Sequence, residues 1–288
     1  MSNGTSRQAW SLIAVLLAAT GCASTSEYAK FAQAGSAYAS ALDHVLIAAA
    51  QTSVDATSER LLQDDAVSNQ DLKSYRSLSD VDEERLVTIG KLRAHTHLLA
   101  AYFRLLGDFA NTDASARAEA AVGAVVDSLS SLGGQLRARR SALNQETLAG
   151  VTPLVVGAKV NAALKKELER RKETIRLELQ TQEALLGELA AEIDHDVRVT
   201  RDAKEQRVVI APLLEPKPIA NASAWADNRR AILTSRSALD ELANGKDAGT
   251  ELRTTFEDLV SGKVTLGRID ALLASIDGLL SVAASLTR

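Results

Sequence analysis

An apolar stripe between residues 153 and 209 constrains the fold of this chain more than any other sequence feature. At 100° per residue, eight aliphatic side chains fall within one sector of a helix about 100° wide. A stripe that continues over more than thirty residues predicts one long helix that packs against partner helices. Pro153 fits the first turn of this helix, where a backbone N–H is not needed. The stripe consists of Val160, Leu164, Leu168, Ile175, Leu179, Leu186, Leu189 and Ile193.

The composition favours helix in the rest of the chain as well. Hydrophobic residues make up 46% of the 288 residues but aromatic residues only 3%, so the apolar content is mainly Ala, Leu, Val and Ile. Proline occurs only four times. Strong helix formers and few helix breakers predict an all-α protein. We expect an elongated helical bundle of five or six helices that includes long, coiled-coil-like helices.

Helical spacing of apolar residues also predicts the other elements. Further helices are expected at residues 26–63, 79–111, 113–136, 223–244 and 248–286, with a loop or short helix at 64–78. Ser79 or Asp80 is expected to cap the second of these helices, and Asp113 the third. Residues 207–211 are the one segment that could form a short strand.

A proline-rich segment at residues 212–218 is expected to end the long helix, because proline lacks the N–H and restricts the residue before it. This segment is predicted to be an extended turn that separates a C-terminal helical hairpin from the preceding helices. We expect residues 22–288 to form a single helical-bundle domain.

The N-terminus carries the pattern of an export signal. Arg7 precedes an apolar run of about a dozen residues that starts at Trp10 and ends in Ala19-Thr20-Gly21-Cys22. Such a run is too short to span a bilayer as a helix, and its order of charge, apolar residues and small residues is that of a secretory signal. The alternatives are an ordinary cleaved signal, or the apolar start of a buried helix with an incidental cysteine.

Cys22 is the only cysteine of the chain. Together with the preceding run it resembles the signal peptide and lipobox of bacterial lipoproteins. The resemblance covers residues 1–22 and implies that residues 1–21 are removed and that Cys22 is acylated, which would anchor the protein to a membrane through several acyl chains. Ala23 is not the aspartate that this family associates with retention in the inner membrane. The implied location is therefore the outer membrane, facing the periplasm. No family is recognised for residues 23–288.

Charge argues against nucleic-acid binding, and cysteine content argues against stabilisation by disulfides. Without residues 1–21, the 33 basic residues lose Arg7, and the remaining 32 face 37 acidic residues, for a net charge near −5. No basic footprint for nucleic acid is present. An acylated Cys22 leaves no thiol, so disulfides cannot stabilise the domain.

Catalytic and metal-binding motifs are also absent from the sequence. His95 and His97 are two residues apart and would point roughly 200° away from each other on a helix. No zinc-type spacing, nucleophile motif or phosphate-binding glycine loop occurs, so we predict a non-enzymatic protein without a cofactor. The one local cluster is Asp194-His195-Asp196, which could bind a divalent cation with low affinity. We favour the alternative that it is a solvated acidic patch.

Arg171 and Gln182 interrupt the apolar stripe of the long helix. If the stripe faces other helices, both would be polar positions within a helix interface, where they could line a polar pocket or fix the register of the helices. We favour the alternative that this face is partly wet, or that Arg171 extends outward along its apolar stem.

The sequence therefore predicts a lipid-anchored interaction or structural module of the cell envelope. Its partners would be the membrane, through Cys22, and another envelope protein or itself. The alternative is a helical bundle that binds a small ligand or lipid in a cavity between its helices.

Overall fold

A computed structural model of the chain describes residues 25–109, 160–234 and 247–286, with isolated positions between 121 and 131. All regular elements among these residues are helices and none is a strand, which confirms the predicted all-α helical bundle. The elements are α1 (Thr25–Gln63), α2 (Leu72–Phe109), α4 (Val160–Glu205), the π-helix η2 (Gln206–Ile210), α5 (Ala211–Leu214), α6 (Ala222–Thr234), α8 (Asp247–Val260) and α9 (Leu266–Leu286).

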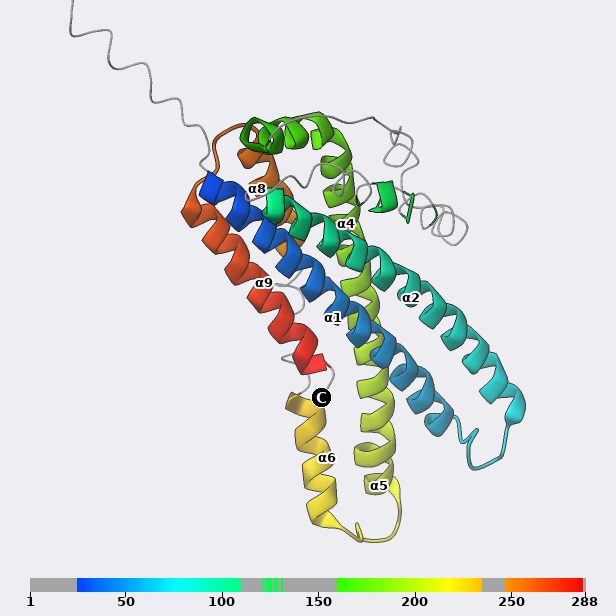
Figure 1. Cartoon of the computed structure of the whole chain (residues 1–288). Helices are drawn as coiled ribbons and strands as arrows, with labels where there is room; N and C mark the ends of the chain where they lie inside the picture. Colours follow the sequence, from blue (N-terminus) through cyan, green and yellow to red (C-terminus); the bar gives the residue numbers. More distant parts are fainter. Residues whose placement is uncertain are drawn as a thin grey trace, which may run out of the picture.

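Three long helices form the frame of the bundle (Figure 1). α1 and α2 are an antiparallel hairpin, and α4 packs along α1. α8 and α9 pack against the first part of α1, and α8 also packs against α4. The turn between α1 and α2 and the turn after α5 both lie at the end of the bundle opposite the start of α1.

α1 agrees with its predicted range of 26–63, but α2 begins earlier than predicted. A turn at residues 64–71 contains two positive φ angles, 54° at both Asp65 and Gln70. Asp71 then caps α2, because its Oδ1 accepts hydrogen bonds of 3.1 Å from the N–H groups of Lys73 and Ser74. The loop or short helix predicted at 64–78 is thus a turn only as far as residue 71, because residues 72–78 belong to the long helix α2, and the predicted cap at Ser79 or Asp80 is wrong. The first turns of α2 place no large side chain in the core, so they lack the apolar periodicity that would reveal a helix.

The end of the long helix also differs from its prediction. Residues 207–211 are not a strand: most of them belong to η2, where the N–H of Ala211 donates to the carbonyl of Gln206, five residues earlier. Pro212 does not end the helix, which continues as α5 to Leu214. In a regular α-helix the Pro212 ring would clash with the carbonyl four residues before it, and the wider π turn accommodates it.

The single helix predicted at 248–286 is two helices. α8 ends in a turn where Gly262 has a φ of 71° and the N–H of Lys263 donates to the carbonyl of Asp258 over 2.8 Å. Thr265 begins α9, since its Oγ1 accepts from the N–H of Arg268 at 3.3 Å. The segment Ser261-Gly262-Lys263 is thus a helix stop that the apolar periodicity on both sides conceals.

Several predictions lie outside the described residues. These are the cleavage site at Cys22, the helix start at Pro153, most of the helix at 113–136 and the end of the helix at 223–244.

The hydrophobic core occupies only one half of the bundle. We call residues 25–49, 89–109, 171–193 and 247–286 the proximal half, and residues 50–88 and 194–234 the distal half. Apart from Val125, every buried residue of the main hydrophobic core lies in the proximal half. The predicted stripe of α4 contributes Ile175, Leu179, Leu186, Leu189 and Ile193 to it.

Aromatic rings fix the closest approach between helices in the proximal half. The ring of Phe31 on α1 lies 5.9 Å, between centroids, from those of Phe103 on α2 and Phe256 on α8. Gly35 makes this possible, because a Cβ at that position would clash with the Phe103 ring. Even alanine at position 35 would push α1 and α2 apart.

Candidate functional site

A cluster of polar side chains lies within the proximal half, where α1, α2 and α4 meet. We call Tyr38, His95, Glu178 and Gln182 the polar centre. Their exposed fractions are 0%, 1%, 3% and 1%, respectively. Buried polar groups cost free energy unless they are hydrogen-bonded, so their contacts determine what the polar centre does.

Glu178 is the acceptor on which the polar centre is built. Its Oε1 lies 2.7 Å from Nε2 of His95 on α2 and 2.7 Å from Nε2 of Gln182, one turn later on α4. A carboxylate only accepts hydrogen bonds, so both nitrogens donate to the same oxygen. The pair between His95 and Glu178 thereby connects α2 to α4, and Gln182 orients the carboxylate.

Other atoms of the polar centre lack a hydrogen-bond partner among the described residues: the Tyr38 hydroxyl, His95 Nδ1, Glu178 Oε2 and Gln182 Oε1. Burial raises the pKa of the Tyr38 hydroxyl far above its usual value, and the charges of Glu178 and Glu183 add to this shift. Tyr38 therefore stays neutral at any physiological pH. A carboxylate–imidazole pair can serve in acid–base chemistry, but a substrate in solvent cannot touch side chains that are at most 3% exposed.

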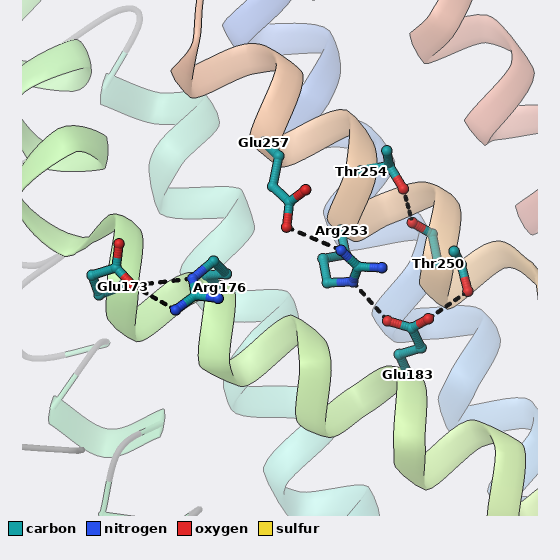
Figure 2. Close-up of polar contacts among 7 residues, drawn as sticks. All are labelled: Glu173, Arg176, Glu183, Thr250, Arg253, Thr254 and Glu257. Carbon is teal, nitrogen blue, oxygen red and sulfur yellow. Dashed lines mark hydrogen bonds and ion pairs between the residues drawn. The ribbon is translucent and has the colours of Figure 1, made fainter. Parts of the chain in front are cut away.

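A second polar contact joins α4 to α8 beside the polar centre (Figure 2). Glu183 accepts 2.7 Å hydrogen bonds from Nε of Arg253 and from the hydroxyl of Thr250, and Arg253 also donates to Glu257 over 3.0 Å. Burial acts to raise the pKa of Glu183, but the hydrogen bonds from Arg253 and Thr250 outweigh burial and lower it. Glu183 is therefore charged, and both of its carboxylate oxygens accept hydrogen bonds from α8. We call these contacts of Glu183 with Thr250 and Arg253 the Glu183 clamp.

Gly249 allows α8 to come this close to α4. A Cβ at position 249 would lie 3.2 Å from the Cα of Glu183 and 3.2 Å from the Tyr38 hydroxyl. The backbone of α8 thus forms one wall of the polar centre, which closes it on the side of α8. The polar centre and the Glu183 clamp together set the register of the proximal helices.

The residues that the sequence singled out occupy different places. Gln182 is part of the polar centre, whereas Arg171 is half-buried near the start of the described part of α4. Cys22 lies outside the described residues.

The three residues of the predicted acidic cluster do not converge on a common point. Asp194 pairs with Arg198 over 2.9 Å, His195 is exposed, and Asp196 pairs with Arg85 of α2 over 2.8 Å. Successive residues on a helix point 100° apart, which explains the divergence. Nowhere among the described residues do three or more His, Asp or Glu side chains form a group that could hold a metal ion.

Sequence reasoning missed Glu178, Tyr38 and the role of His95. A signal for Glu178 was available: it follows Val160 by eighteen residues, which is five helical turns, so both point in the same direction at the edge of the apolar stripe. The contact of Glu178 with His95 on α2 depends on helix packing, which no local pattern contains.

The distal half offers a different kind of surface. Twelve of the thirteen exposed large hydrophobic side chains among the described residues lie there, and only Leu266 lies in the proximal half. The twelve are Val54, Leu62, Val67, Leu72, Tyr75, Val81, Leu86, Val87, Ile210, Leu213, Leu214 and Leu233. We call them the distal apolar residues. They come from both hairpins, α1–α2 and α4–α6, which end on the same side of the bundle (Figure 1).

An open groove of about 440 Å³ lies between α1 and α2 in the proximal half. Phe103 and Ala32 are among its apolar lining residues, and Arg104 and Gln33 are among its polar ones. Its volume is within the range of ligand pockets, about 300–1,000 Å³. It is a groove on the surface of the hairpin rather than a cavity between helices.

Comparison with known proteins gives no match of any kind: no protein-family model, no curated protein and no solved structure matches this chain.

Proposed function

We propose that this protein is a lipoprotein anchored through Cys22 to the outer membrane, where it faces the periplasm and acts as a non-enzymatic interaction or structural module. The observation that carries this proposal is the position of the distal apolar residues, twelve of the thirteen exposed large hydrophobic side chains. Exposed apolar side chains that gather in one region of a protein commonly mark an interaction site. The polar centre supports the non-enzymatic part of the proposal, because its side chains are buried between helices and out of reach of a substrate in solvent.

The geometry of α1 connects the anchor to this surface. Cys22 precedes the start of α1 at Thr25 by three residues, which span at most about 11 Å. α1 has 39 residues and is therefore about 60 Å long. An acylated Cys22 would hold the proximal half near the membrane and place the distal apolar residues at the far end of this helix.

One helix of the proximal half is also apolar enough to cross a bilayer. α9 has 21 residues, and an 18-residue window within it has a mean hydropathy of 1.6. Ile269, Leu272, Ile276 and Leu279 on one of its faces are fully buried, and α9 packs against α1 and α8. We therefore assign α9 to the folded bundle and the membrane attachment to Cys22.

The anchor and the interaction surface are tested separately. Cys22→Ser is expected to move the protein out of the membrane fraction, and a variant that remains in that fraction would contradict the anchor. For the surface, wild type and variants are cross-linked in intact envelopes and the captured proteins are identified by mass spectrometry. Val87→Asp and Leu214→Asp, one in each hairpin, are expected to abolish capture of a specific partner.

Leu266→Asp is the matched control, because Leu266 is the exposed large hydrophobic residue of the proximal half. It should capture the same proteins as wild type. If all three variants capture what wild type captures, the distal apolar residues are not the interaction surface.

The second candidate function is binding of a lipid or small ligand, and the groove between α1 and α2 favours it. Its apolar lining and the exposed Arg104 suit a molecule with an apolar chain and an anionic group. Purified protein should then bind vesicles that contain anionic phospholipid, and Ser40→Trp, which places a large side chain at an exposed position of the groove, should weaken this binding. Equal binding by wild type and this variant would contradict the candidate.

A further inference from the structure

The first turns of α2 carry an exposed stripe with a regular spacing. Leu72, Arg76, Ser79, Glu83 and Leu86 follow one another at intervals of 4, 3, 4 and 3 residues. At 100° per residue they share a sector about 80° wide. The exposed fractions of Leu72 and Leu86 are 54% and 41%, Arg76 and Glu83 are exposed, and Ser79 is half-buried. We call these five residues the α2 stripe.

The α2 stripe is complementary to itself when a second copy is reversed. From either end it starts with leucine and has serine at its centre, while arginine and glutamate exchange places. A two-fold axis at Ser79 would therefore set Leu72 directly against Leu86 of the other copy. It would set Arg76 one residue from the point opposite its Glu83, an offset of about 1.5 Å along the helix that these long side chains can span. An isologous interface has this property. If residue i of one copy contacts residue j of the other, then residue j of the first copy also contacts residue i of the second.

We propose that a second copy of this chain docks antiparallel along the α2 stripe. Charge selects both the partner and the direction. Two copies in parallel would oppose Arg76 to Arg76 and Glu83 to Glu83, and juxtaposed like charges are costly. The antiparallel arrangement instead forms two Arg–Glu pairs, flanked on each side by a pair of leucines that exclude water.

The surface next to the α2 stripe leaves room for the partner. Gly90 follows Leu86 by one turn on the same side of α2, and a Cβ at that position would meet no other atom within 4 Å. The turn at residues 64–71 of the second copy would lie beside it. The overlap from 72 to 86 is fifteen residues, about 22 Å of helix, so the two molecules would extend in opposite directions.

A contact of this length is small, and we expect it to be reversible, with a dissociation constant of about micromolar magnitude. The inference deepens the proposed function, since it names the partner of one part of the distal surface. It rests on that surface being used for interaction and does not depend on the acylation of Cys22.

The test uses the full chain with Cys22→Ser, so that it can be studied without detergent. Sedimentation at increasing protein concentration and low salt should show a monomer–dimer equilibrium. Arg76→Glu alone and Glu83→Arg alone should each weaken dimers at least about tenfold, because each creates two pairs of like charges.

An equal mixture of these two single variants is the decisive sample. One copy then carries two glutamates and the other two arginines, so both interface pairs become attractive and heterodimers should form. The double variant Arg76→Glu with Glu83→Arg should also dimerise. Both positions are exposed on a helix, and circular dichroism is expected to show unchanged helix content.

Three results would overturn the inference: a wild-type chain that stays monomeric at about 0.5 mM, dimers that are insensitive to Arg76→Glu, or a mixture of single variants that does not associate. If the chain stays monomeric but loses a different envelope protein on Arg76→Glu, the second copy is excluded and the proposed function stands. Failure of Cys22→Ser to leave the membrane would bear only on the anchor.

Discussion

The proximal and distal halves of the bundle share the helices α1, α2 and α4 but are stabilised in different ways. The proximal half contains the main hydrophobic core, with rings of phenylalanine between its helices and the polar centre at its middle. In the distal half the buried residues are mainly small or polar, among them Ala56, Thr52 and Ser53, and the larger apolar ones are Val209 and Ile232. Hydrophobic burial scales with area, so the proximal half provides most of the folding free energy.

In the distal half, beyond the main hydrophobic core, polar contacts join the helices. In the distal half Arg207 forms a bidentate pair with Glu59 at 2.8 and 3.0 Å, and the hydroxyl of Thr57 donates to Asp82 over 2.7 Å. Trp225 of α6 donates from its indole nitrogen to the carbonyl of Val209 over 3.1 Å. Such contacts fix geometry but contribute little net stability. One continuous helix can therefore be a core element at one end and carry exposed apolar side chains at the other.

The different contributions of the two halves to stability are tested most directly by truncating one side chain of α2 in each half. Phe103→Ala in the proximal half should lower the free energy of unfolding by about 3–5 kcal/mol, because it leaves a cavity in the core. Val87→Ala in the distal half should change it by less than about 0.5 kcal/mol, since Val87 is exposed. Urea denaturation of both variants measures the difference. Similar losses would show that both halves contribute equally.

Two carboxylates that each pair with arginine, one in each half, have pKa values shifted in opposite directions. Hydrogen bonds from Arg93 lower the pKa of Asp43 in the proximal half, whereas burial raises the pKa of Asp196 in the distal half even though Arg85 opposes it. Asp43→Asn should cost about 1 kcal/mol at pH 7. Because the folded pKa of Asp43 lies below its unfolded value near 4, its contribution is complete above pH 4 and disappears on further acidification.

Asp196 should behave in the opposite sense. Its folded pKa lies above the unfolded value, so the ionised group lowers stability at neutral pH, and this penalty disappears as the pH falls to about 4. Asp196→Asn should therefore cost less than Asp43→Asn at pH 7, and its deficit relative to wild type should grow towards pH 4. Denaturant unfolding between pH 3 and 7 tests both variants. Deficits with the same pH dependence would refute the opposite pKa directions.

The smallest expected effect concerns one hydroxyl. Tyr38→Phe removes a buried hydroxyl that lacks a hydrogen-bond partner among the described residues, so it should raise stability by up to about 1 kcal/mol. Tyr75→Phe, at a 55% exposed position, is the matched control and should have no measurable effect.

The same pair of tyrosine variants has a pH dependence. The folded pKa of Tyr38 is raised, so wild type should lose stability as the pH rises above about 10, where the unfolded tyrosine ionises. Tyr38→Phe should lose less than wild type over this range. A variant that is less stable than wild type at pH 7 would mean that the Tyr38 hydroxyl is hydrogen-bonded.

The sequence predicted what depends on apolar periodicity and missed what depends on packing or local turn chemistry. The stripe of α4 predicted a long helix because Leu179, Leu186 and Ile193 recur with the period of a helix and are all buried. The turn at Gly262 was missed, since leucines before and after it keep a helical spacing. The first turns of α2 were missed because they bury nothing large. His95 could not be assigned, because its partner Glu178 lies on another helix, 83 residues away.

α4, η2 and α5 run without interruption from Val160 to Leu214. The hydrogen bond from Ala211 to Gln206 spans five residues instead of four, so this stretch holds one residue more than an α-helix of the same height requires. Because the wider turn takes up this extra residue, the segments before and after it keep nearly the orientation they would have on an uninterrupted α-helix. Inserting one residue into a regular turn of the same helix would instead rotate everything after it by about 100° around the helix axis. The hydrogen bond from Trp225 to the carbonyl of Val209 requires the present orientation, so the direction in which α6 folds back depends on the extra residue being held in the wide turn.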